Sequence, residues 1–268
     1  MIIDSHTHSW FSHDSKTSPE AIVKAALELG MQYLAFTDHC DRDCVVAQLD
    51  WTQIDLAQYT ASISALQKKY KDAPLYIALG IEVGYDKRAV AHYLADFAKY
   101  QFDVIINSIH LVDLADIYRK EYFIGKDKAL AYSLYLEAVL ESLDTPYDYD
   151  IVGHLGYISR NAPYEDRSMP YADFSKLIDK ILLKIIELDK SLEVNSAVKT
   201  LPLLHLPDTD ILKRYRQLGG DNITFGSDAH QQARLAQNYQ PICEQLKVLG
   251  FTHFTIYKQR EPYKIAIP

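Results

Sequence analysis

Two histidines separated by one residue lie near the start of the chain, in the segment IIDSHTH at residues 2–8. In an extended strand alternate side chains point to one face, so His6 and His8 lie on the same side, with Cβ atoms roughly 7 Å apart. Two imidazoles placed this way can converge on one metal ion. A His-x-His pair alone is more often incidental than a ligand pair, so the prediction depends on whether such residues recur.

Further histidines and acidic residues follow short apolar segments along the rest of the chain. They are His39, Glu82, His110, His154, Asp228 and His230. Each is individually explained as a hydrogen-bonded core or loop residue, but so many at equivalent positions favour a shared site. Imidazoles combined with carboxylates are typical of sites for Zn, Fe or Mn, rather than Ca or Mg. Glu82 is the only acid at the end of its apolar segment, which makes it the candidate to bridge two cations.

Short apolar segments alternate with helical patterns throughout the chain. Strands are expected at 2–8, 33–39, 75–82, 104–110, 151–154, 192–195 and 223–226. Helices are expected at about 18–30, 52–70, 88–99, 127–143, 171–189, 209–218 and 241–250, with loops at 111–126 and 155–170 and a strand pair or tail at 251–267. Ser18 before Pro19 is a good helix start, and Asp208 is expected to be the N-cap of its helix.

Alternating strands and helices indicate a parallel sheet. About seven such units in one domain, residues 1–268, predict a closed or nearly closed TIM-like α/β barrel, with a doubly wound open sheet as the alternative. Barrel enzymes place their chemistry at the carboxyl ends of the strands. The histidines and acids described above fall at those ends.

Composition restricts the function classes. The 268 residues are 48% hydrophobic and 24% charged, as in a soluble globular protein, and the formal net charge of −8 disfavours a protein that coats nucleic acid. Three cysteines do not make a disulfide framework, and we find no signal peptide and no apolar segment near the roughly 20 residues that span a bilayer. The expected location is the cytoplasm.

Six segments together resemble the polymerase and histidinol phosphatase (PHP) superfamily of metallophosphoesterases. They are HTH at 6–8 with Ser12 four residues on, TDH at 37–39, GIE at 80–82, NSIH at 107–110, GH at 153–154 and GSDAH at 226–230. They occur in the family's order from one end of the chain to the other. The resemblance implies a distorted (β/α)7 barrel with a trinuclear metal site. Chain length, the lone domain and Asn195-Ser196 after the sixth strand are most similar to the histidinol-phosphate phosphatase branch.

The resemblance also implies ligands for two to three divalent ions of Zn, Fe or Mn. The three groups are His6, His8, Glu82 and Asp228; Glu82 and His110; and His39, His154, His230 and the residue two positions after Ser12. In many relatives that last ligand is a histidine, whereas here it is Asp14. Aspartate is a good ligand for Zn, and neighbouring His13 is the alternative. Asp4 and Asp38 are expected to orient imidazoles rather than bind metal.

A bound phosphate needs hydrogen-bond donors besides metal ions. Arg160 is the first candidate, because the guanidinium fork matches two phosphate oxygens. Weaker candidates for substrate contacts are Arg119, Lys199, Tyr118, Tyr157 and Asn195. For proton transfer, Asp228 is the candidate to accept the proton of the nucleophile and His13 to assist the leaving alkoxide.

The resulting hypothesis is a metal-dependent phosphomonoesterase that hydrolyses L-histidinol phosphate in histidine biosynthesis. Water activated by the cations would attack phosphorus in line with the ester oxygen. One alternative is another phosphoesterase of the superfamily, acting on phosphotyrosine in proteins or on a nucleotide 3′ end. Another is a barrel that binds metal without catalysis. The expected partner is a small phosphate ester, with no nucleic acid and no membrane, and the oligomeric state is left open.

Overall fold

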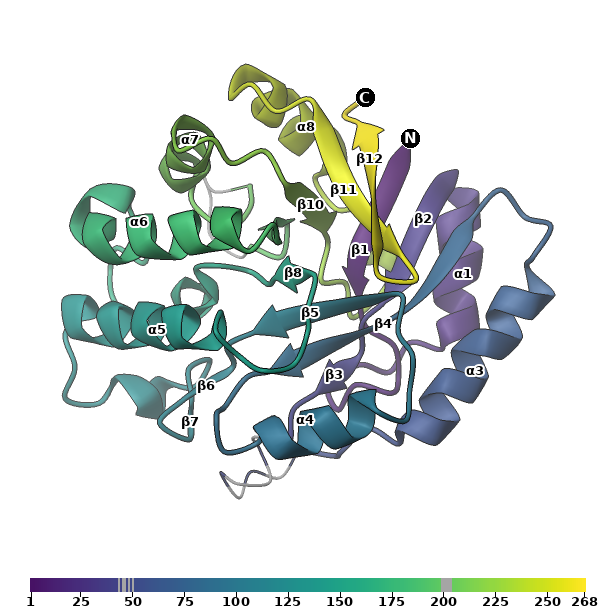
Figure 1. The fold of residues 1–268 in the computed structure, drawn as a ribbon, viewed down its shortest axis with the longest axis horizontal. Helices are drawn as coiled ribbons and strands as arrows, with labels where there is room; N and C mark the ends of the chain where they lie inside the picture. The colour runs from purple at the N-terminus through teal and green to yellow at the C-terminus, as the bar shows by residue number, and fades with distance from the viewer. Residues whose placement is uncertain (43, 45–46, 48, 50, 199–203) are drawn as a thin grey trace.

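Seven parallel strands form one continuous sheet in the computed structural model, which describes every residue except 43, 45–46, 48, 50 and 199–203 (Figure 1). In sheet order they are β1 (Ile2–Thr7), β2 (Met31–Phe36), β4 (Tyr76–Gly84), β5 (Val104–Ser108), β8 (Ile151–Val152), β9 (Ser191–Asn195) and β10 (Ile223–Gly226). A short strand, β3 (His39–Cys40), pairs beside the end of β4. The amide of Asp228 donates to the His6 carbonyl at 2.8 Å, and that of His8 to the Ala229 carbonyl at 3.0 Å. These bonds join the end of β10 to β1, so the predicted barrel is confirmed and the open sheet is wrong.

Helices surround the barrel on its outside (Figure 1). They are α1 (Pro19–Glu28), α3 (Leu56–Lys69), α4 (Val90–Phe97), α5 (Lys128–Ser142), α6 (Tyr171–Glu187), α7 (Thr209–Gln217) and α8 (Tyr239–Val248). Ser18 caps α1 as predicted, because its hydroxyl accepts from the Ala21 amide at 3.2 Å. The helix expected from residue 52 begins later, because the Asp55 carboxylate captures the first free amides and fixes the start at Leu56.

Asp208 stands at the N-cap position of α7, but its side chain makes no capping hydrogen bond. Its Oδ2 accepts instead from the Met169 amide at 3.2 Å, which ties the loop before α6 to the start of α7. The predicted N-cap position of Asp208 is therefore confirmed, but its side chain does not cap the helix.

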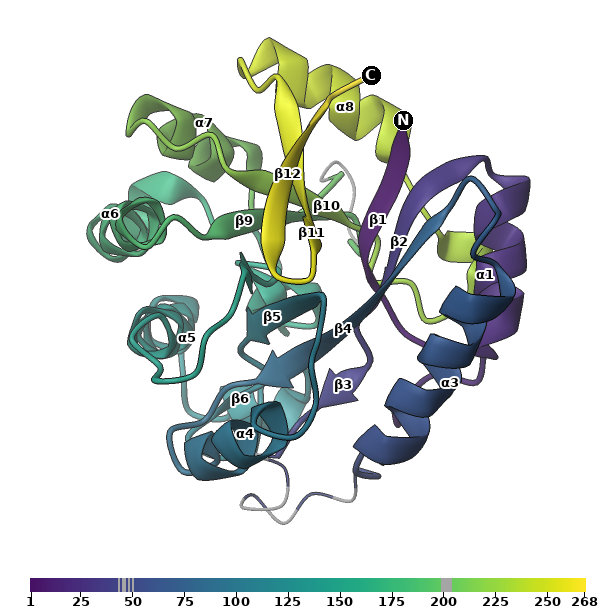
Figure 2. The ribbon, with the colours of Figure 1, turned by 45° about the vertical axis from the view of Figure 1, so that its right-hand side comes forward.

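The C-terminal hairpin crosses the amino ends of the barrel strands (Figure 2). It consists of β11 (His253–Lys258) and β12 (Glu261–Ala266), the antiparallel pair expected at 251–267. The Tyr257 hydroxyl donates to the Asp150 carbonyl at 3.2 Å, and the Arg260 amide to the Asp103 carbonyl at 2.9 Å. Asp150 and Asp103 directly precede β8 and β5, so the hairpin covers that end of the barrel and leaves the carboxyl ends for the site.

The segments expected as plain loops at the carboxyl ends contain local structure. Residues 111–126 include the hairpin β6 (Leu111–Val112) and β7 (Ala115–Asp116) and the 3₁₀ turn η1 (Lys120–Phe123). After β8, Gly156 has φ of 107° and begins the 3₁₀ turn η2 (Tyr157–Arg160). A third such turn, η3 (Gln232–Arg234), follows β10. These turns fix the direction of side chains at the rim.

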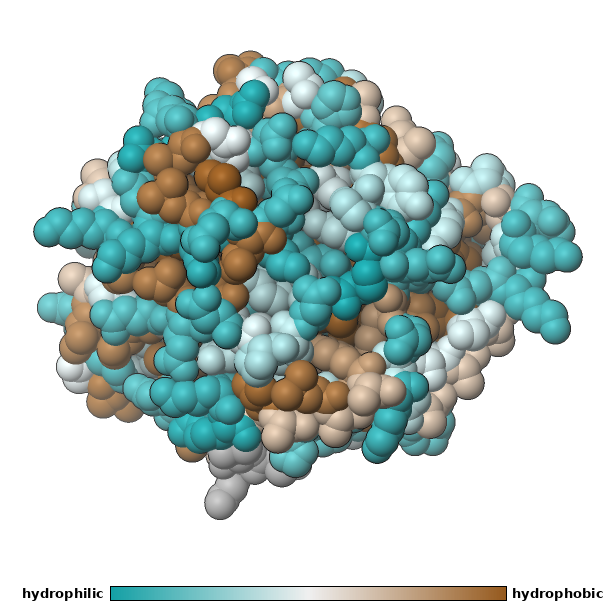
Figure 3. All heavy atoms as spheres, in the orientation of Figure 1, coloured by the Kyte–Doolittle hydropathy of each residue, from teal (hydrophilic) through white to brown (hydrophobic). Residues whose placement is uncertain are grey.

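The outer surface in the view of Figure 3 is mostly hydrophilic, with brown apolar areas on the left, where α5 and α6 lie in Figure 1. Leu130 of α5 and Leu183 of α6 are about half exposed. Among the described residues, no helix has the length and apolar character needed to cross a membrane.

Candidate metal centre and active site

A cavity of about 560 Å³ opens at the carboxyl ends of the strands. Its lining includes His13, Asp14, His39, Asp41, Trp51, His110, Asp116, Tyr118, Arg119, His154, Tyr157, Arg160, Asp228, His230 and Arg234. Side chains from nearly the whole length of the chain thus meet at one rim. His6, His8 and Glu82 lie beneath this lining and are fully buried.

The first predicted ligand group is assembled at the floor of the cavity. The Nε2 atoms of His6 and His8, from the carboxyl end of β1, lie 3.0 Å apart. Glu82 Oε2, from β4, lies 3.3 Å from His6 Nε2 and 3.5 Å from His8 Nε2. Asp228 Oδ1 lies 3.1 Å from His8 Nε2. Three strands therefore place two imidazoles and two carboxylates around one point.

The second group lies on the other side of Glu82. Glu82 Oε1 is 3.2 Å from His110 Nε2 and 2.8 Å from His154 Nε2. Glu82 thus faces both groups with different oxygens, which is the arrangement expected of a bridging carboxylate. His154 was expected beside His39, but its Nε2 lies 3.4 Å from that of His110. How the ligands divide among ions stays a prediction, and this geometry favours His154 in the second group.

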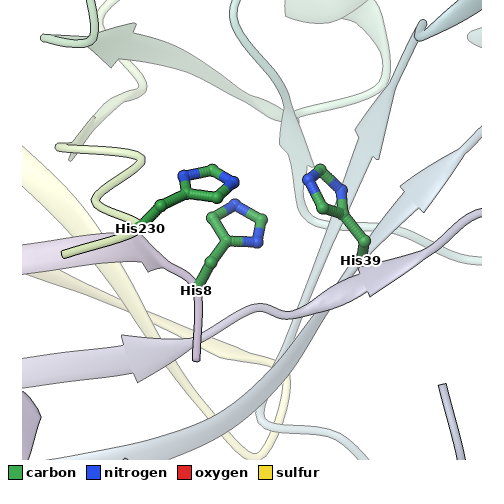
Figure 4. Close-up of side chains that lie close together, drawn as sticks. All are labelled: His8, His39 and His230. Atoms are coloured by element: carbon green, nitrogen blue, oxygen red, sulfur yellow. The ribbon is translucent and has the colours of Figure 1, made fainter. Parts of the chain in front are cut away.

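The third group is closest to the cavity mouth. Figure 4 shows His8 and His230 with their rings close together and His39 approaching from β3. Asp14 Oδ2 is 3.0 Å from His230 Nε2, and Asp14 Oδ1 is 3.7 Å from His39 Nε2. The His13 ring stacks on Trp51 with centroids 4.7 Å apart and is 5.3 Å from the His39 ring. Of the two candidates Asp14 is therefore the better placed to complete this group.

Hydrogen bonds to Nδ1 determine which nitrogens face the centre. His6 Nδ1 is 2.6 Å from a Glu193 oxygen, which can only accept. His8 Nδ1 is 3.0 Å from the hydroxyl of Ser12, whose own proton goes to Asp38 at 2.8 Å. Both rings thus donate from Nδ1, and in their neutral forms both Nε2 atoms carry lone pairs that point at each other. Such lone pairs repel unless a cation lies between them, so this donor set fits a metal ion.

Two further imidazoles are held in the same way. His110 donates from Nδ1 to Asp41 Oδ1 at 2.8 Å, and His230 from Nδ1 to the Asp228 carbonyl at 3.0 Å. Their Nε2 atoms are left to face Glu82 and Asp14. Within the described part of the chain, the buried atoms Glu82 Oε2 and His230 Nε2 make no well-aligned hydrogen bond, although His39 Nδ1 and Asp14 Oδ2 lie 2.9 and 3.0 Å from them. Buried polar atoms without a well-aligned hydrogen bond are costly, so they mark positions where an ion would be bound.

The titration behaviour reflects the same concentration of charge. Burial opposes protonation of His110, yet Asp41 and Glu82 raise its pKa to about 10. For Glu82, burial favours the neutral acid, but His6 and His110 hold its pKa well below the usual value. Burial and the neighbouring His230 lower the pKa of His8 to about 3. Glu82 and Asp41 are therefore ionised, and the negative charge that raises the pKa of His110 would also attract divalent cations.

Two of the surrounding acids were singled out from the sequence, and two, Asp41 and Glu193, were missed. Asp38 orients His8 through Ser12, close to expectation. Asp4 was expected to orient an imidazole, but it accepts from the backbone amides of Ser227 at 2.8 Å and Ala236 at 3.0 Å, because β1 directs it toward the segment after β10. Asp41 was overlooked, although its position two residues after His39 is a usable signal.

Arg160 is at the end of η2 and extends over the floor of the site. Its Nη1 lies 2.8 Å from Asp228 Oδ2, and its Nη2 donates to Asn195 Oδ1 at 2.7 Å. The guanidinium carbon is 4.9 Å from the centroid of the Tyr157 ring. Nε has no hydrogen-bond partner among the described residues. A rigidly held guanidinium with a spare N–H is well suited to a phosphate oxygen.

The remaining predicted contacts are at the rim. Tyr118 lines the cavity, and Arg119 lies at its mouth, 61% exposed and paired with Asp116 at 3.1 Å. Asn195 contacts Arg160 rather than the cavity itself, and Lys199 lies outside the described residues. The sequence reasoning missed Trp51, Asp116 and Arg234 as lining residues, because they lie on a loop, a two-residue strand and a short 3₁₀ turn, which are too short to give a periodic signal.

Comparison with known proteins agrees with this geometry. A family model described as the PHP domain matches residues 4–197. The chain belongs to this family, whose members the ordered segments already resembled.

Individual relatives can also be compared. A histidinol-phosphatase of Lactococcus lactis subsp. lactis is 32% identical over 229 residues, covering 85% of this chain and 84% of the relative. A probable histidinol-phosphatase of Clostridium acetobutylicum is 28% identical, covering 90% of this chain and 91% of the relative. The crystal structure of histidinol phosphate phosphatase from Lactococcus lactis, complexed with zinc, L-histidinol and phosphate, matches with a TM-score of 0.88 and 28% identity over 98% of both chains.

Proposed function

We propose that this chain hydrolyses L-histidinol phosphate to L-histidinol and phosphate, as a metal-dependent phosphomonoesterase of histidine biosynthesis. The observation that carries the proposal is the match over 98% of the chain to a phosphatase bound to zinc, L-histidinol and phosphate. The cavity of this chain independently provides an imidazole and carboxylate cage beneath a buried arginine. The cavity of about 560 Å³ suits a small ester, and we propose the cytoplasm as the location of the protein.

The proposed ligands are those that the structure gathers at the floor and mouth of the cavity. They are His6, His8, Glu82, Asp228, His110, His154, His39, His230 and Asp14. Two to three divalent ions of Zn, Fe or Mn held there would neutralise phosphate charge and lower the pKa of water. The protein's own contribution is to fix the donors in a buried site before substrate arrives.

We propose that Arg160 binds the phosphoryl group. Its two contacts with Asp228 and Asn195 and its stacking on Tyr157 orient the guanidinium, so little rotamer entropy is lost when phosphate binds. Charge that develops on the phosphoryl oxygens during the reaction would be stabilised by this fixed cation. Rim residues Tyr118 and Arg119 remain proposed substrate contacts.

Proton transfer is proposed for two residues that face the cavity. Asp228 is the acid nearest to Arg160 and therefore to the proposed phosphate position, which supports it as the acceptor of the nucleophile's proton. Partial burial and the nearby His39 lower the pKa of His13, which favours its neutral imidazole before substrate arrives. A bound phosphate dianion raises the pKa of an adjacent imidazole, which would let His13 carry a proton to the leaving alkoxide.

The test is a side-by-side assay of phosphate release from histidinol phosphate, phosphotyrosine and a nucleotide 3′-phosphate, with elemental analysis of the purified protein. We expect histidinol phosphate to be hydrolysed with the highest kcat/KM, and the variants His8→Ala and Glu82→Ala to lose both activity and metal. Full activity in either variant would reject the metal site. Preference for another ester would reject the proposed substrate, and metal binding without hydrolysis of any ester would support a non-catalytic barrel.

A further inference from the structure

Glu193 is a fully buried carboxylate in the middle of β9, between the apolar residues Leu192 and Val194. Its Oε1 accepts from His6 Nδ1 at 2.6 Å, and its Oε2 accepts from the backbone amide of His154 at 2.5 Å. His6 belongs to the first ligand group and His154 to the second. One side chain thus holds a residue from each group, at strands on both sides of β9.

The route of the side chain from β9 to His6 depends on a glycine. His6 is on β1, and β10 lies between β9 and β1. At Gly226 of β10 a Cβ atom would stand 2.1 Å from Glu193 Oε1 and 2.6 Å from His6 Cβ. Any larger residue would therefore displace the carboxylate, and the bare backbone at this position lets Glu193 reach across β10.

The two hydrogen bonds have different consequences for the ligands. Because the carboxylate only accepts, it fixes the proton of neutral His6 on Nδ1 and leaves the Nε2 lone pair facing Glu82 and His8. The bond to the His154 amide holds the backbone where the chain leaves β8, which sets where that imidazole enters the site. Partners of this kind, which orient metal-binding histidines, typically change metal affinity by 10–100-fold when they are removed.

We infer that Glu193 is a positioning residue that prepares His6 and His154 together for metal binding, an inference that rests on the proposed metal site. Glutamine at this position keeps the shape but has one acceptor and one donor group. If its oxygen accepts from the His154 amide, its NH₂ faces His6 Nδ1, which must then hold the lone pair. The His6 proton moves to Nε2 and points at the metal position. If the glutamine side chain is turned the other way, its NH₂ group faces the backbone N–H of His154, and two donors then meet without an acceptor.

The test compares wild type with Glu193→Gln in the full-length protein stripped of metal. Zinc affinity is measured by competition with a chromophoric chelator, and the His6 tautomer by ¹⁵N chemical shifts of the metal-free imidazole at a pH high enough to make the ring neutral, because the neighbouring carboxylates raise the pKa of His6 well above its usual value. We expect zinc to bind 10–100-fold more weakly to Glu193→Gln, with the His6 proton on Nε2 instead of Nδ1. The matched control is Glu165→Gln, which is exposed and should change neither quantity.

A second variant covers the case in which Glu193→Gln does not fold. Glu193→Asp keeps the charge but is one methylene shorter and cannot reach both partners, so we expect zinc affinity to fall about 3–30-fold, within or just below the range typical of such partners. Wild-type zinc affinity in the variant that folds would overturn the inference. That result is distinct from failure of the proposed function, which would appear as wild-type protein that binds zinc without hydrolysing histidinol phosphate.

Discussion

Replacement of Arg160 provides the sharpest test of how the site handles phosphate. The side chain is 9% exposed, donates to Asn195 Oδ1 at 2.7 Å and lies 2.8 Å from Asp228 Oδ2. Arg160→Met keeps much of the apolar volume over Tyr157 but removes the charge and every N–H. If one of these donors meets the phosphoryl oxygens as charge develops, its loss costs about 2.7–4 kcal/mol, or about 10²–10³-fold in kcat.

The assay is phosphate release over a range of histidinol phosphate concentrations, with metal content measured for each sample. Arg160→Lys keeps the charge but cannot hold both Asn195 and Asp228, so we expect a loss of roughly tenfold, or about 1.4 kcal/mol. Asn195→Ala removes one anchor and keeps the guanidinium, so its loss should be smaller still. An Arg160→Met variant with normal metal content and kcat/KM within a few-fold of wild type would refute the phosphate-binding role.

Three further predictions concern other parts of the molecule. Asp14→Ala should lose bound metal at the cavity mouth, whereas His13→Ala should retain it; elemental analysis decides, and the opposite pattern would make His13 the ligand. Gly153→Ala should lower the free energy of unfolding by about 1–3 kcal/mol through overpacking, because the new Cβ would stand 2.2 Å from Ser108 Oγ. Thermal unfolding should show that a second substitution, Ser108→Ala, restores part of this stability. If it restores none, the clash lies elsewhere. Burial raises the pKa of Asp208 from 3.8 to about 6, so ionisation of this buried carboxyl lowers the free energy of unfolding as the pH rises from 3.8 to 6 and has no effect below that range. The free energy of unfolding of Asp208→Asn, measured with urea, should therefore increase relative to wild type by up to about 3 kcal/mol between pH 4 and pH 7. A difference that does not change with pH would contradict this prediction.

The architecture could be predicted because its signals are local. Alternating apolar segments and helical patterns, with capping residues such as Ser18, define the strands and helices of the barrel and therefore the edge at which their ends meet. Boundaries were less certain, as at α3, where Asp55 rather than an earlier residue captures the free amides. The 111–126 segment was misjudged as a loop because its short hairpin depends on a turn at Asp113 and Leu114 with positive φ, for which the sequence offers no glycine.

The ligand candidates could be predicted for a related reason. His39, His110 and His154 each stand at or just beyond the end of an apolar strand, so topology alone brings them to one rim. The acids that orient them could not be predicted with the same ease. Asp41 is on an irregular segment, and Glu193 is in the middle of a strand, where its partners come from other strands and only the assembled barrel identifies them.

Two of the three glycines in the matching segments, Gly153 and Gly226, acquire a physical reason in this structure. A Cβ at Gly153 would collide with Ser108, whose hydroxyl donates to Glu82 at 2.8 Å, and a Cβ at Gly226 would collide with Glu193, which holds His6. Each glycine thus makes room for a side chain that holds a proposed ligand on another strand. Glycine before a ligand in this barrel is then a packing requirement between neighbouring strands, not a demand for unusual backbone angles, since neither residue has positive φ. The metal cage therefore depends on residues that bind nothing themselves, and these are the positions where substitution should loosen the site without removing a ligand.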